Sequence, residues 1–548
     1  MNILTHLNFL DLIIIALYFI FVLGMGAYVK TKTLNSADFF LAGRRNRSWV
    51  AGLAFLSANM GALELLGMSG LSYQYGVLTA HFYLIGAIPA MLFLAIFMMP
   101  FYYSTRVHSI PEYLHLRFNG ATRTLNAYAF AIMTLLMSGI NMYAMALVLN
   151  VFVGWNFHTS VWVSSATVAC YIALGGLASA IFSEVMQFFI IWLGLFLAII
   201  LGYLHIGSAQ EILNNLPEGF KHLWATTGST QNNPMHVEWF SIVFGLGFVL
   251  AFGYWTADFL VIQRAFSAKD LRSARMAPVL ASFFKMALPM IVVGAGLIVF
   301  VLVKMAKIPK LQRPDDALLY LVNYVYPHGL LGLGVTALLA GFMAGQAGNV
   351  SAFNTIFTYD IYKAHIVKNA SDQHYLIVGR IATIGGILLS ILTAYWAMSM
   401  PTIMDYMQAI FSIVNAPLFG IILFGMFWKR INGQGAFWGL LIGMVFSAIL
   451  FILVQFNYLA PEHVTFTSDS SPMAINFWRA IWAFLATIII TVVVSFVSAK
   501  PDLERIKGFV YTKGTHFGSA ETVAWYRRPT IWAVISLIIL IILNIIFW

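Results

Sequence analysis

Long apolar stretches, separated by short polar segments, follow one another along almost the whole chain. A helix crosses the hydrocarbon core of a bilayer with about 20 mostly apolar residues. We therefore predict an all-α polytopic membrane protein with about 14 transmembrane helices, in which residues 1–548 form a single transmembrane domain. A shorter amphipathic segment, 307–328, predicts a short surface helix. The candidate spans are 9–29, 48–72, 76–104, 123–152, 158–178, 180–206, 237–262, 276–303, 329–362, 377–398, 400–427, 433–456, 474–499 and 529–548.

The composition excludes a water-soluble protein. Hydrophobic residues make up 61% of the chain and charged residues only 9%, whereas a soluble domain has about 25% charged residues. The net charge of +10 would suggest a nucleic-acid partner in a soluble protein, but in a membrane protein it reflects Lys and Arg in cytoplasmic loops. We therefore expect the lipid bilayer and a small solute as partners, and no nucleic acid.

The placement of basic residues predicts the orientation of the chain. Most of the 30 Lys and Arg residues fall in alternate loops, beginning with the loop after the first span. Because basic residues accumulate on the cytoplasmic side, these loops are predicted to be cytoplasmic. An even number of spans then places both termini outside, in a multi-pass protein of the cell inner membrane.

Two spans contain polar and glycine-rich interruptions. The first has Ser57, Asn59, Gly61 and Glu64 within the span 48–72, and the second has the sequence GYWTAD at 253–258. Unwound backbone at membrane depth occurs where it lines a cavity or is buried in protein. Two broken helices five spans apart are typical of transporters built from two inverted five-helix repeats. The alternative is that these glycines only permit close packing of helices.

The two predicted repeats are separated from flanking helices on both sides. The first repeat is expected at about 48–206 and the second at about 237–427. The flanking helices are expected within 9–29 and 433–548.

Charged residues at membrane depth are costly and usually mark a pathway or a partner. Glu64 lies beside the first break, and Lys285 lies in the middle of the span 276–303. A carboxylate accepts hydroxyl protons and an ammonium group donates, so together these side chains suit a polyhydroxylated solute. Two alternatives are an ion pair that never contacts the solute and a proton relay through Glu64.

Other polar residues in the spans have less specific interpretations. Glu184 begins a span at its cytoplasmic end, where it either lines the exit or is a solvated charge favoured by the helix dipole. Asp258 precedes Arg264, and we expect a local salt bridge between them. His81 and Tyr83 fall in the early part of the span 76–104, where His81 is either a packing residue or a ligand.

The sequence offers no support for an enzyme or an ATP-driven pump. It has one cysteine, Cys170, no His, Cys, Asp and Glu cluster with metal-ligand spacing, and no phosphate-binding loop of the Walker type. No catalytic residue, resident metal or cofactor is therefore predicted.

An ordered set of short motifs resembles the sodium/solute symporter family, and within it the sodium/glucose cotransporter-like branch. Each motif is modest by itself, but their order along residues 36–430 is specific. The motifs are SADFFLAGR at 36–44, AN at 58–59 with GMSG at 67–70, IPEY at 110–113 with RF at 117–118, GGL at 175–177 before Glu184, YW at 254–255 with QR at 263–264, NTIFT at 354–358 before DIY at 360–362, and GMFWK at 425–429.

This resemblance implies the LeuT-type 5+5 inverted repeat and alternating access around a midplane site. It implies sugar-site roles for Glu64, Lys285 and Gln408, and places Tyr254 where an aromatic ring closes the site from the cytoplasmic side. Glu64 replaces an amide of the relatives. Tyr83 stands where the relatives have a polar sugar contact, so the recognised hydroxyl pattern is expected to differ.

The resemblance also implies a sodium site with an altered set of ligands. The relatives use backbone carbonyls at the first break, here Ser57 and Met60, and hydroxyl side chains on the ninth span. On that span the matching run begins at Gly341, and Ala344 and Gly345 stand where the hydroxyls are expected. These residues carry no side-chain oxygen. Sodium is a hard cation that prefers oxygen ligands, so we expect sodium binding to be weakened.

These observations predict a secondary active transporter of a small polar solute, with a monosaccharide as the favoured substrate and Na⁺ or H⁺ as the coupling ion. The alternatives are a sodium-independent or proton-coupled carrier of a sugar or an organic acid, and a sensor that binds a solute without transporting it.

Overall fold

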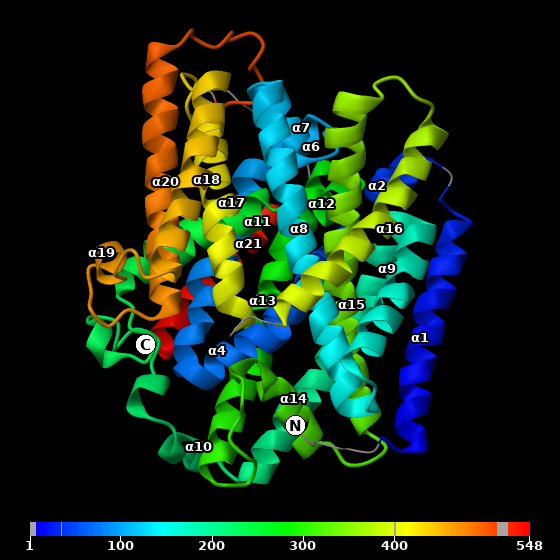
Figure 1. The fold of residues 1–548 in the computed structure, drawn as a ribbon, viewed down its shortest axis with the longest axis vertical. Helices are drawn as coiled ribbons and strands as arrows, with labels where there is room; N and C mark the ends of the chain where they lie inside the picture. Colours follow the sequence, from blue (N-terminus) through cyan, green and yellow to red (C-terminus); the bar gives the residue numbers. More distant parts are fainter. Residues whose placement is uncertain (1–6, 34, 399–401, 512–523) are drawn as a thin grey trace.

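The computed structural model describes residues 7–33, 35–398, 402–511 and 524–548. Helices account for nearly all of the regular structure, and they run mostly along one direction in a tall bundle (Figure 1). Both ends of the described chain lie in the half of the bundle that carries the short helices α10 (Ala209–Asn215) and α14 (Ala317–Val325).

Long apolar helices form the bundle. In the described part of the chain, 11 helices are long and apolar enough to cross a membrane. The number is up to 13 when each of two bent helix pairs is counted as one span. The long helices are α1 (Phe9–Lys30), α8 (Gly120–Val148), α9 (Phe157–Ile206), α13 (Leu271–Lys304), α15 (Leu331–Ile356), α16 (Asp372–Ala397), α17 (Ile403–Phe427), α18 (Gly433–Gln455), α20 (Pro472–Val497) and α21 (Pro529–Ile546).

The predicted count of about 14 spans is not confirmed. The expected spans 158–178 and 180–206 correspond to the two parts of α9, which are separated by a turn at Gly176 (φ 58°, ψ −145°). Of these two parts, Gly175–Ile206 is among the described helices that are long and apolar enough to cross a membrane. A Cβ atom at Gly176 would lie 2.5 Å from the carbonyl oxygen of Phe39, so this turn requires glycine. The expected span 76–104 corresponds to one continuous candidate span, Phe82–Ser104, which consists of η4 (Phe82–Ala87), α5 (Ile88–Phe93), η5 (Leu94–Met98) and α6 (Met99–Ser104).

The first predicted break is confirmed. Helix α3 (Ser48–Asn59) ends at Met60, whose φ and ψ of −78° and 41° leave the helical range. The chain resumes as η2 (Leu63–Gly67) and α4 (Met68–Tyr75), bent by 63° from α3. The N–H group of Ala62 donates to Asn141 Oδ1 over 2.8 Å, so a side chain of α8 satisfies part of the unwound backbone.

The second predicted break is also confirmed. The π-helical segment η9 (Ser241–Ala251) and α11 (Phe252–Ala257) end at Asp258, and α12 (Phe259–Phe266) continues at an angle of 46°. Asp258 caps α12 by accepting from the N–H group of Leu260 over 2.9 Å. The expected salt bridge between Asp258 and Arg264 is wrong, because the Arg264 guanidinium turns to Glu184 on α9 instead.

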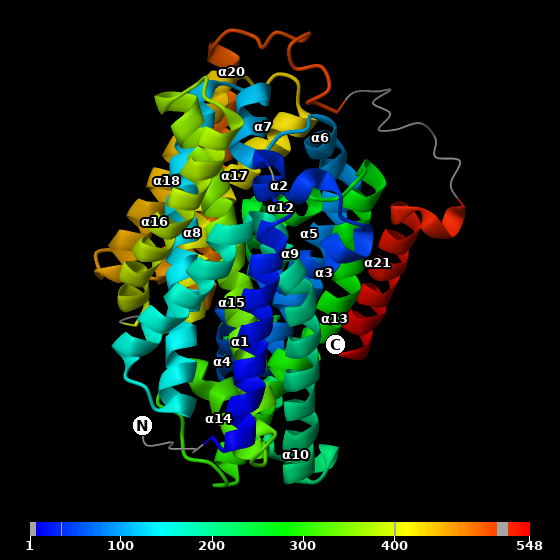
Figure 2. The same cartoon turned by 90° about the vertical axis from the view of Figure 1, so that its right-hand side faces the viewer.

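Burial separates core helices from peripheral ones. In the most apolar 18 residues of α15, 94% are buried, against 22% in α18 and 28% in α1. Figure 2 shows α21 along α13 at the edge of the bundle. Exposed Ile, Leu and Phe side chains lie on the peripheral helices. Lipid would cover this surface, because large apolar patches are unfavourable in water.

Several short helices connect the long ones. The amphipathic segment 307–328 does contain a helix, α14, but it is shorter than the segment and Ala317–Val322 are all buried. The others are α2 (Ser36–Leu41), α7 (Ile110–Arg117) and α19 (Glu462–Thr465).

Candidate substrate site

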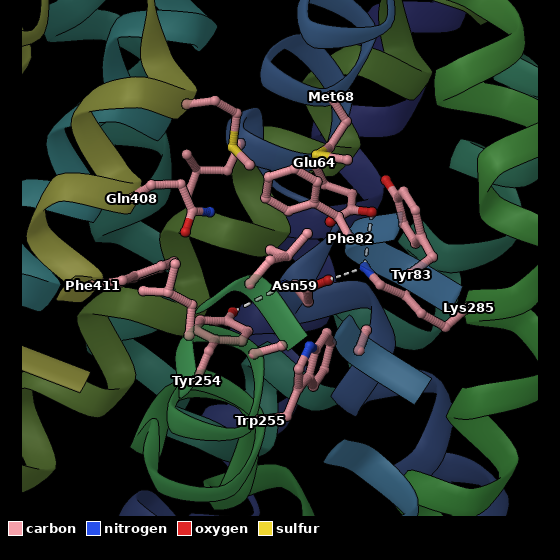
Figure 3. Close-up of a pocket in the computed structure, with 16 residues that line it drawn as sticks. Asn59, Glu64, Met68, Phe82, Tyr83, Tyr254, Trp255, Lys285, Gln408 and Phe411 are labelled. Carbon is pink, nitrogen blue, oxygen red and sulfur yellow. Dashed lines mark hydrogen bonds and ion pairs between the residues drawn. The ribbon is translucent and has the colours of Figure 1, made fainter. Parts of the chain in front are cut away.

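A small cavity lies where the two broken helices meet in the middle of the bundle. Its volume is about 80 Å³, which is room for a few water molecules. The lining comes from the α3–α4 break, η4, the η9–α11 helix, α13 and α17. Figure 3 shows Gln408 on one side of this cavity and Glu64, Asn59 and Lys285 on the other, with aromatic rings around it.

Glu64 and Lys285 form an ion pair in the wall of the cavity. Lys285 Nζ lies 2.8 Å from Glu64 Oε1, and the side chains of Lys285 and Glu64 are only 3% and 10% exposed. The ammonium group also lies 4.9 Å from the ring centroid of Tyr83 and 5.1 Å from that of Trp255. A cation in this position is favoured by the carboxylate and by both aromatic rings.

A chain of polar contacts continues from this pair across both broken helices. Lys285 Nζ donates to Asn59 Oδ1 over 2.5 Å, and Asn59 Nδ2 donates to the Tyr254 hydroxyl over 2.9 Å (Figure 3). Asn59 ends α3 and Tyr254 lies in α11, so this last bond joins the two broken helices directly. The Tyr254 ring also packs on Phe411, with centroids 5.2 Å apart.

Gln408 faces the cavity from α17. Its Oε1 is buried and has no hydrogen-bond partner among the described residues. A buried unpaired acceptor is unfavourable, so this oxygen is suited to a donor from a bound solute. Hydroxyl groups offer both donors and acceptors, and the cavity presents Gln408, Asn59 and the ion pair to match them.

The structure brings together five of the six residues predicted for the substrate site: Glu64, Lys285, Gln408, Tyr254 and Tyr83 line the cavity. His81 does not line it. Its Nε2 lies 2.8 Å from the Leu223 carbonyl oxygen, and its ring packs 4.3 Å from that of Trp224. This placement fits the packing alternative for His81.

Glu184 is buried away from the cavity. Its carboxylate forms a two-point salt bridge with Arg264, and both side chains are fully buried. The alternative of a solvated charge at a helix start is therefore wrong. Arg264 also donates to Ser351 Oγ on α15 over 3.2 Å, so this pair ties α9, α12 and α15 together.

Sequence reasoning missed several residues of the lining: Asn59, Met68, Phe82, Trp255, Met404 and Phe411. Asn59 carried a usable signal, because an amide beside a helix break at membrane depth has few alternative partners. The aromatic and methionine side chains carried none, since such residues are common throughout the spans.

Comparison with known proteins identifies the family. The model of the sodium:solute symporter family matches residues 39–443. This chain belongs to the sodium:solute symporter family. Sodium/myo-inositol cotransporter 2 of Oryctolagus cuniculus is 28% identical over 531 residues, covering 90% of this chain and 78% of the relative. The sodium/glucose cotransporter of Vibrio parahaemolyticus is 26% identical over 480 residues, covering 82% of this chain and 86% of the relative.

A solved structure shares the fold. A Na⁺-coupled sialic acid symporter in a substrate-bound outward-open state superposes with a TM-score of 0.77 at 19% identity, covering 90% of this chain and 99% of that one. The family member described here is therefore an all-α membrane protein with the LeuT-type inverted-repeat fold, as predicted. It is a secondary transporter, and its family consists of symporters rather than enzymes.

The positions predicted for sodium offer few oxygen atoms in this transporter. Ala344 and Gly345 on α15 supply no side-chain oxygen. Gly345 packs against the first break, because a Cβ on Gly345 would lie 2.8 Å from Gly61 Cα and 2.6 Å from Asn141 Oδ1. Gly341 also packs against the first break, because a Cβ on Gly341 would lie 2.8 Å from the Met60 carbonyl oxygen. Ser57 Oγ is a buried oxygen without a partner in the described chain, and it is the one side-chain oxygen among these five positions.

Proposed function

We propose that this transporter carries a monosaccharide, or a ring polyol of similar size, by alternating access between the two sides of the membrane. The supporting observation is the ion pair of Glu64 and Lys285 beside Asn59 and the unpaired Gln408, all facing one cavity. This group supplies acceptors and donors for several hydroxyls at once. The relatives named for glucose and myo-inositol transport favour the same class of solute.

The solute would replace contacts that the protein makes with itself. The cavity of about 80 Å³ is well below the roughly 300–1,000 Å³ that is typical of ligand pockets. We infer that hydroxyl groups of the solute enter between Glu64 and Lys285. The two side chains then either separate or form hydrogen bonds to the solute as well as to each other. The rings of Tyr83, Trp255 and Tyr254 would then cover the apolar faces of the sugar ring.

The bond between Asn59 and Tyr254 supports a role in gating. It joins the two broken helices, and alternating access in this fold moves one group of helices relative to another around a fixed site. Release toward the cytoplasm would require this bond to open. We also propose that the two inverted repeats span 48–206 and 237–427, and that the protein lies in the cell inner membrane with both termini extracytoplasmic. On this proposal, Glu184 and Arg264 hold the helices together on the exit side.

We propose a cation gradient as the driving force, in keeping with the family. Ser57 Oγ and the carbonyl groups of Ser57 and Met60 are the oxygens that sodium would use at the predicted site. A second candidate is transport without sodium. It is favoured by Ala344 and Gly345, which add no oxygen where the relatives are expected to have hydroxyls.

Reconstituted vesicles test both proposals. Purified protein in liposomes would be offered labelled glucose, myo-inositol, sialic acid and acetate under an imposed Na⁺ gradient, an imposed H⁺ gradient, or neither. We expect accumulation of a polyhydroxylated solute under one of the cation gradients. Equal uptake with and without sodium would favour the second candidate. Uptake of acetate alone would refute the sugar proposal, and binding without uptake would identify a sensor.

A further inference from the structure

A second and larger cavity lies outside the candidate substrate site, between α17, α18 and α20. Its volume is about 500 Å³. Its lining residues on these helices come from the first turns of α17 and α20 and from the last turns of α18. Rings of Trp396, Tyr406, Phe451 and Phe456 line it together with the charged residues Arg479 and Asp405. The established family and the proposed function assign nothing to this cavity.

Arg479 is a buried cation that forms no salt bridge with a carboxylate of the described residues. Its Nε donates to Ser412 Oγ over 2.8 Å, another of its nitrogens donates to Asn476 Oδ1, and its guanidinium carbon lies 5.0 Å from the Phe451 ring centroid. In the described chain no acidic oxygen lies within 4.0 Å of this guanidinium, although the residue is only 3% exposed. Buried charges are ordinarily paired, so this one is suited to an anion from outside the chain.

Asp405 is a complementary anion in the same cavity. Its Oδ2 accepts from the Thr402 hydroxyl over 2.6 Å, while its Oδ1 is buried without a partner in the described residues. The Asn476 side chain stands between the two charges, because it accepts from Arg479 and donates to the Asp405 carbonyl oxygen over 3.0 Å. The cavity therefore presents a guanidinium and a carboxylate that are held apart rather than paired with each other.

The rest of the lining is suited to an amphiphile. Phe456 is 66% exposed and Trp396 46% exposed, and both line a cavity whose walls are otherwise mostly apolar. Aromatic residues at the ends of transmembrane helices mark the depth of the lipid headgroups. A ligand here would place a polar head against Arg479 and Asp405 and an apolar tail along Phe451 and Val454.

We propose that this cavity binds a phospholipid whose headgroup carries a phosphate and a primary ammonium group, as phosphatidylethanolamine does. The phosphate would accept hydrogen bonds from the Arg479 guanidinium, and the ammonium group would donate to Asp405 Oδ1. A quaternary ammonium headgroup has no N–H group to donate, and a glycerol headgroup has no positive charge. The site should therefore distinguish phosphatidylethanolamine from phosphatidylcholine and phosphatidylglycerol.

The bound lipid would act on the candidate substrate site through α17. Met404, Gln408 and Phe411 of this helix line the central cavity, while Asp405, Tyr406 and Ala409 line the second one. A headgroup on Asp405 would therefore fix the end of the helix that presents Gln408. This coupling rests on the proposed function, but the binding of the lipid does not.

Competitive lipid retention tests the proposal. The full-length protein would be placed in nanodiscs containing equal parts of the three phospholipids, extracted gently, and its retained lipid measured by native mass spectrometry. We expect selective retention of phosphatidylethanolamine. Arg479→Gln should reduce this retention about tenfold or more, since a charge-assisted contact is lost, and Asp405→Asn should reduce the preference over phosphatidylglycerol.

Matched variants separate recognition from folding. Arg430→Gln removes a guanidinium that contacts Phe496 and the Phe496 carbonyl oxygen at the other end of α18, and it should leave retention unchanged. Arg479→Lys keeps the positive charge, so it serves as the test variant if Arg479→Gln does not fold. It should retain less lipid than the wild type, because it lacks the guanidinium group. We expect that added O-phosphoethanolamine, which has the headgroup but no acyl tail, displaces no lipid, because the site also binds the tail. Saturable binding of O-phosphoethanolamine in place of lipid, or equal retention of all three lipids, would overturn the proposal.

Discussion

Lys285 Nζ lies 2.8 Å from Glu64 Oε1, and this ion pair connects α13 to the second half of the broken helix that begins with α3. Both side chains are buried, so each charge depends on the other for its stability. The pair therefore neutralises charge inside the bilayer, and on our proposal it also binds the solute. A single substitution affects both roles, but a pair of substitutions separates them.

Lys285→Met should leave Glu64 as an unpaired buried charge. We expect a loss of stability of about 3–5 kcal/mol, together with loss of solute binding. The double variant Glu64→Gln with Lys285→Met contains no unpaired charge, so it should recover most of the stability and still fail to bind. Thermal unfolding in detergent and equilibrium solute binding measure the two effects.

Lys304→Met is the matched control for that prediction. Lys304 ends the same helix, and its Nζ donates to the Asn215 carbonyl oxygen over 2.8 Å in an exposed position. It should change neither stability nor binding appreciably. Wild-type affinity in the double variant would show that Glu64 and Lys285 are only structural.

The two helix breaks could be predicted from the sequence, because polar residues and glycines that interrupt an apolar span are tolerated mainly where the backbone unwinds inside the protein. The number of spans is not confirmed, because the first part of α9, where the span 158–178 was expected, is not among the described helices that are long and apolar enough to cross a membrane. The site could be predicted only in part. Glu64 and Lys285 were conspicuous as charges at membrane depth, whereas the role of Asn59 follows from its contacts with Lys285 and Tyr254, which are distant in sequence.

Tyr254→Phe tests the contact between the two broken helices. The substitution keeps the ring against Phe411 but removes the hydroxyl that accepts from Asn59. We expect solute affinity to fall by a factor of about 3 to 10, because closure of the cytoplasmic side loses a hydrogen bond. Tyr458→Phe, at a residue that is 78% exposed, is the control. Unchanged affinity and release rate in Tyr254→Phe would argue against a gating role.

Glu184→Ala should destabilise the protein strongly. It leaves the Arg264 guanidinium buried without its carboxylate, which costs about 3–5 kcal/mol. Glu184→Gln keeps a hydrogen-bond acceptor and should lose less. Glu504→Gln removes one partner of an exposed ion pair and should have almost no effect. Melting temperatures of the three variants give the comparison, and equal melting temperatures would contradict the assigned role.

Titration of Asp315 should contribute to the pH dependence of the protein's stability. Asp315 lies in η10 (Pro314–Asp316), outside the predicted spans. Burial of the Asp315 carboxyl raises its pKa to about 7, although the N–H group of Ile403 and the cation of Arg313 act in the opposite direction. Between about pH 4 and 7 the folded state therefore holds a proton that the unfolded state has lost, and stability falls as the pH rises through this range.

Asp315→Asn should remove this contribution to the pH dependence, because an amide still accepts from the Ile403 N–H group but does not titrate. Asp316 and Asp405 also lie near enough to raise the pKa of Asp315, so the measured quantity is the difference between wild type and variant. Melting temperatures at about pH 5 and about pH 8, on either side of the folded-state pKa, should differ less for Asp315→Asn than for the wild type. An identical difference in both proteins would contradict the prediction.

Ala344 and Gly345 allow sodium binding to be altered from within α15. Ala344→Ser adds a hydroxyl oxygen to an existing Cβ, so Na⁺ should raise the melting temperature of this variant more than that of the wild type. Gly345→Ser should instead lose about 1–3 kcal/mol of stability, because its Cβ would come within 2.8 Å of Gly61 Cα and 2.6 Å of Asn141 Oδ1. Asn141 is held in place by the Ala62 N–H group and cannot move aside freely. Melting curves with NaCl and with choline chloride distinguish the two effects, and an equal sodium response in Ala344→Ser and wild type would remove this position from the sodium site.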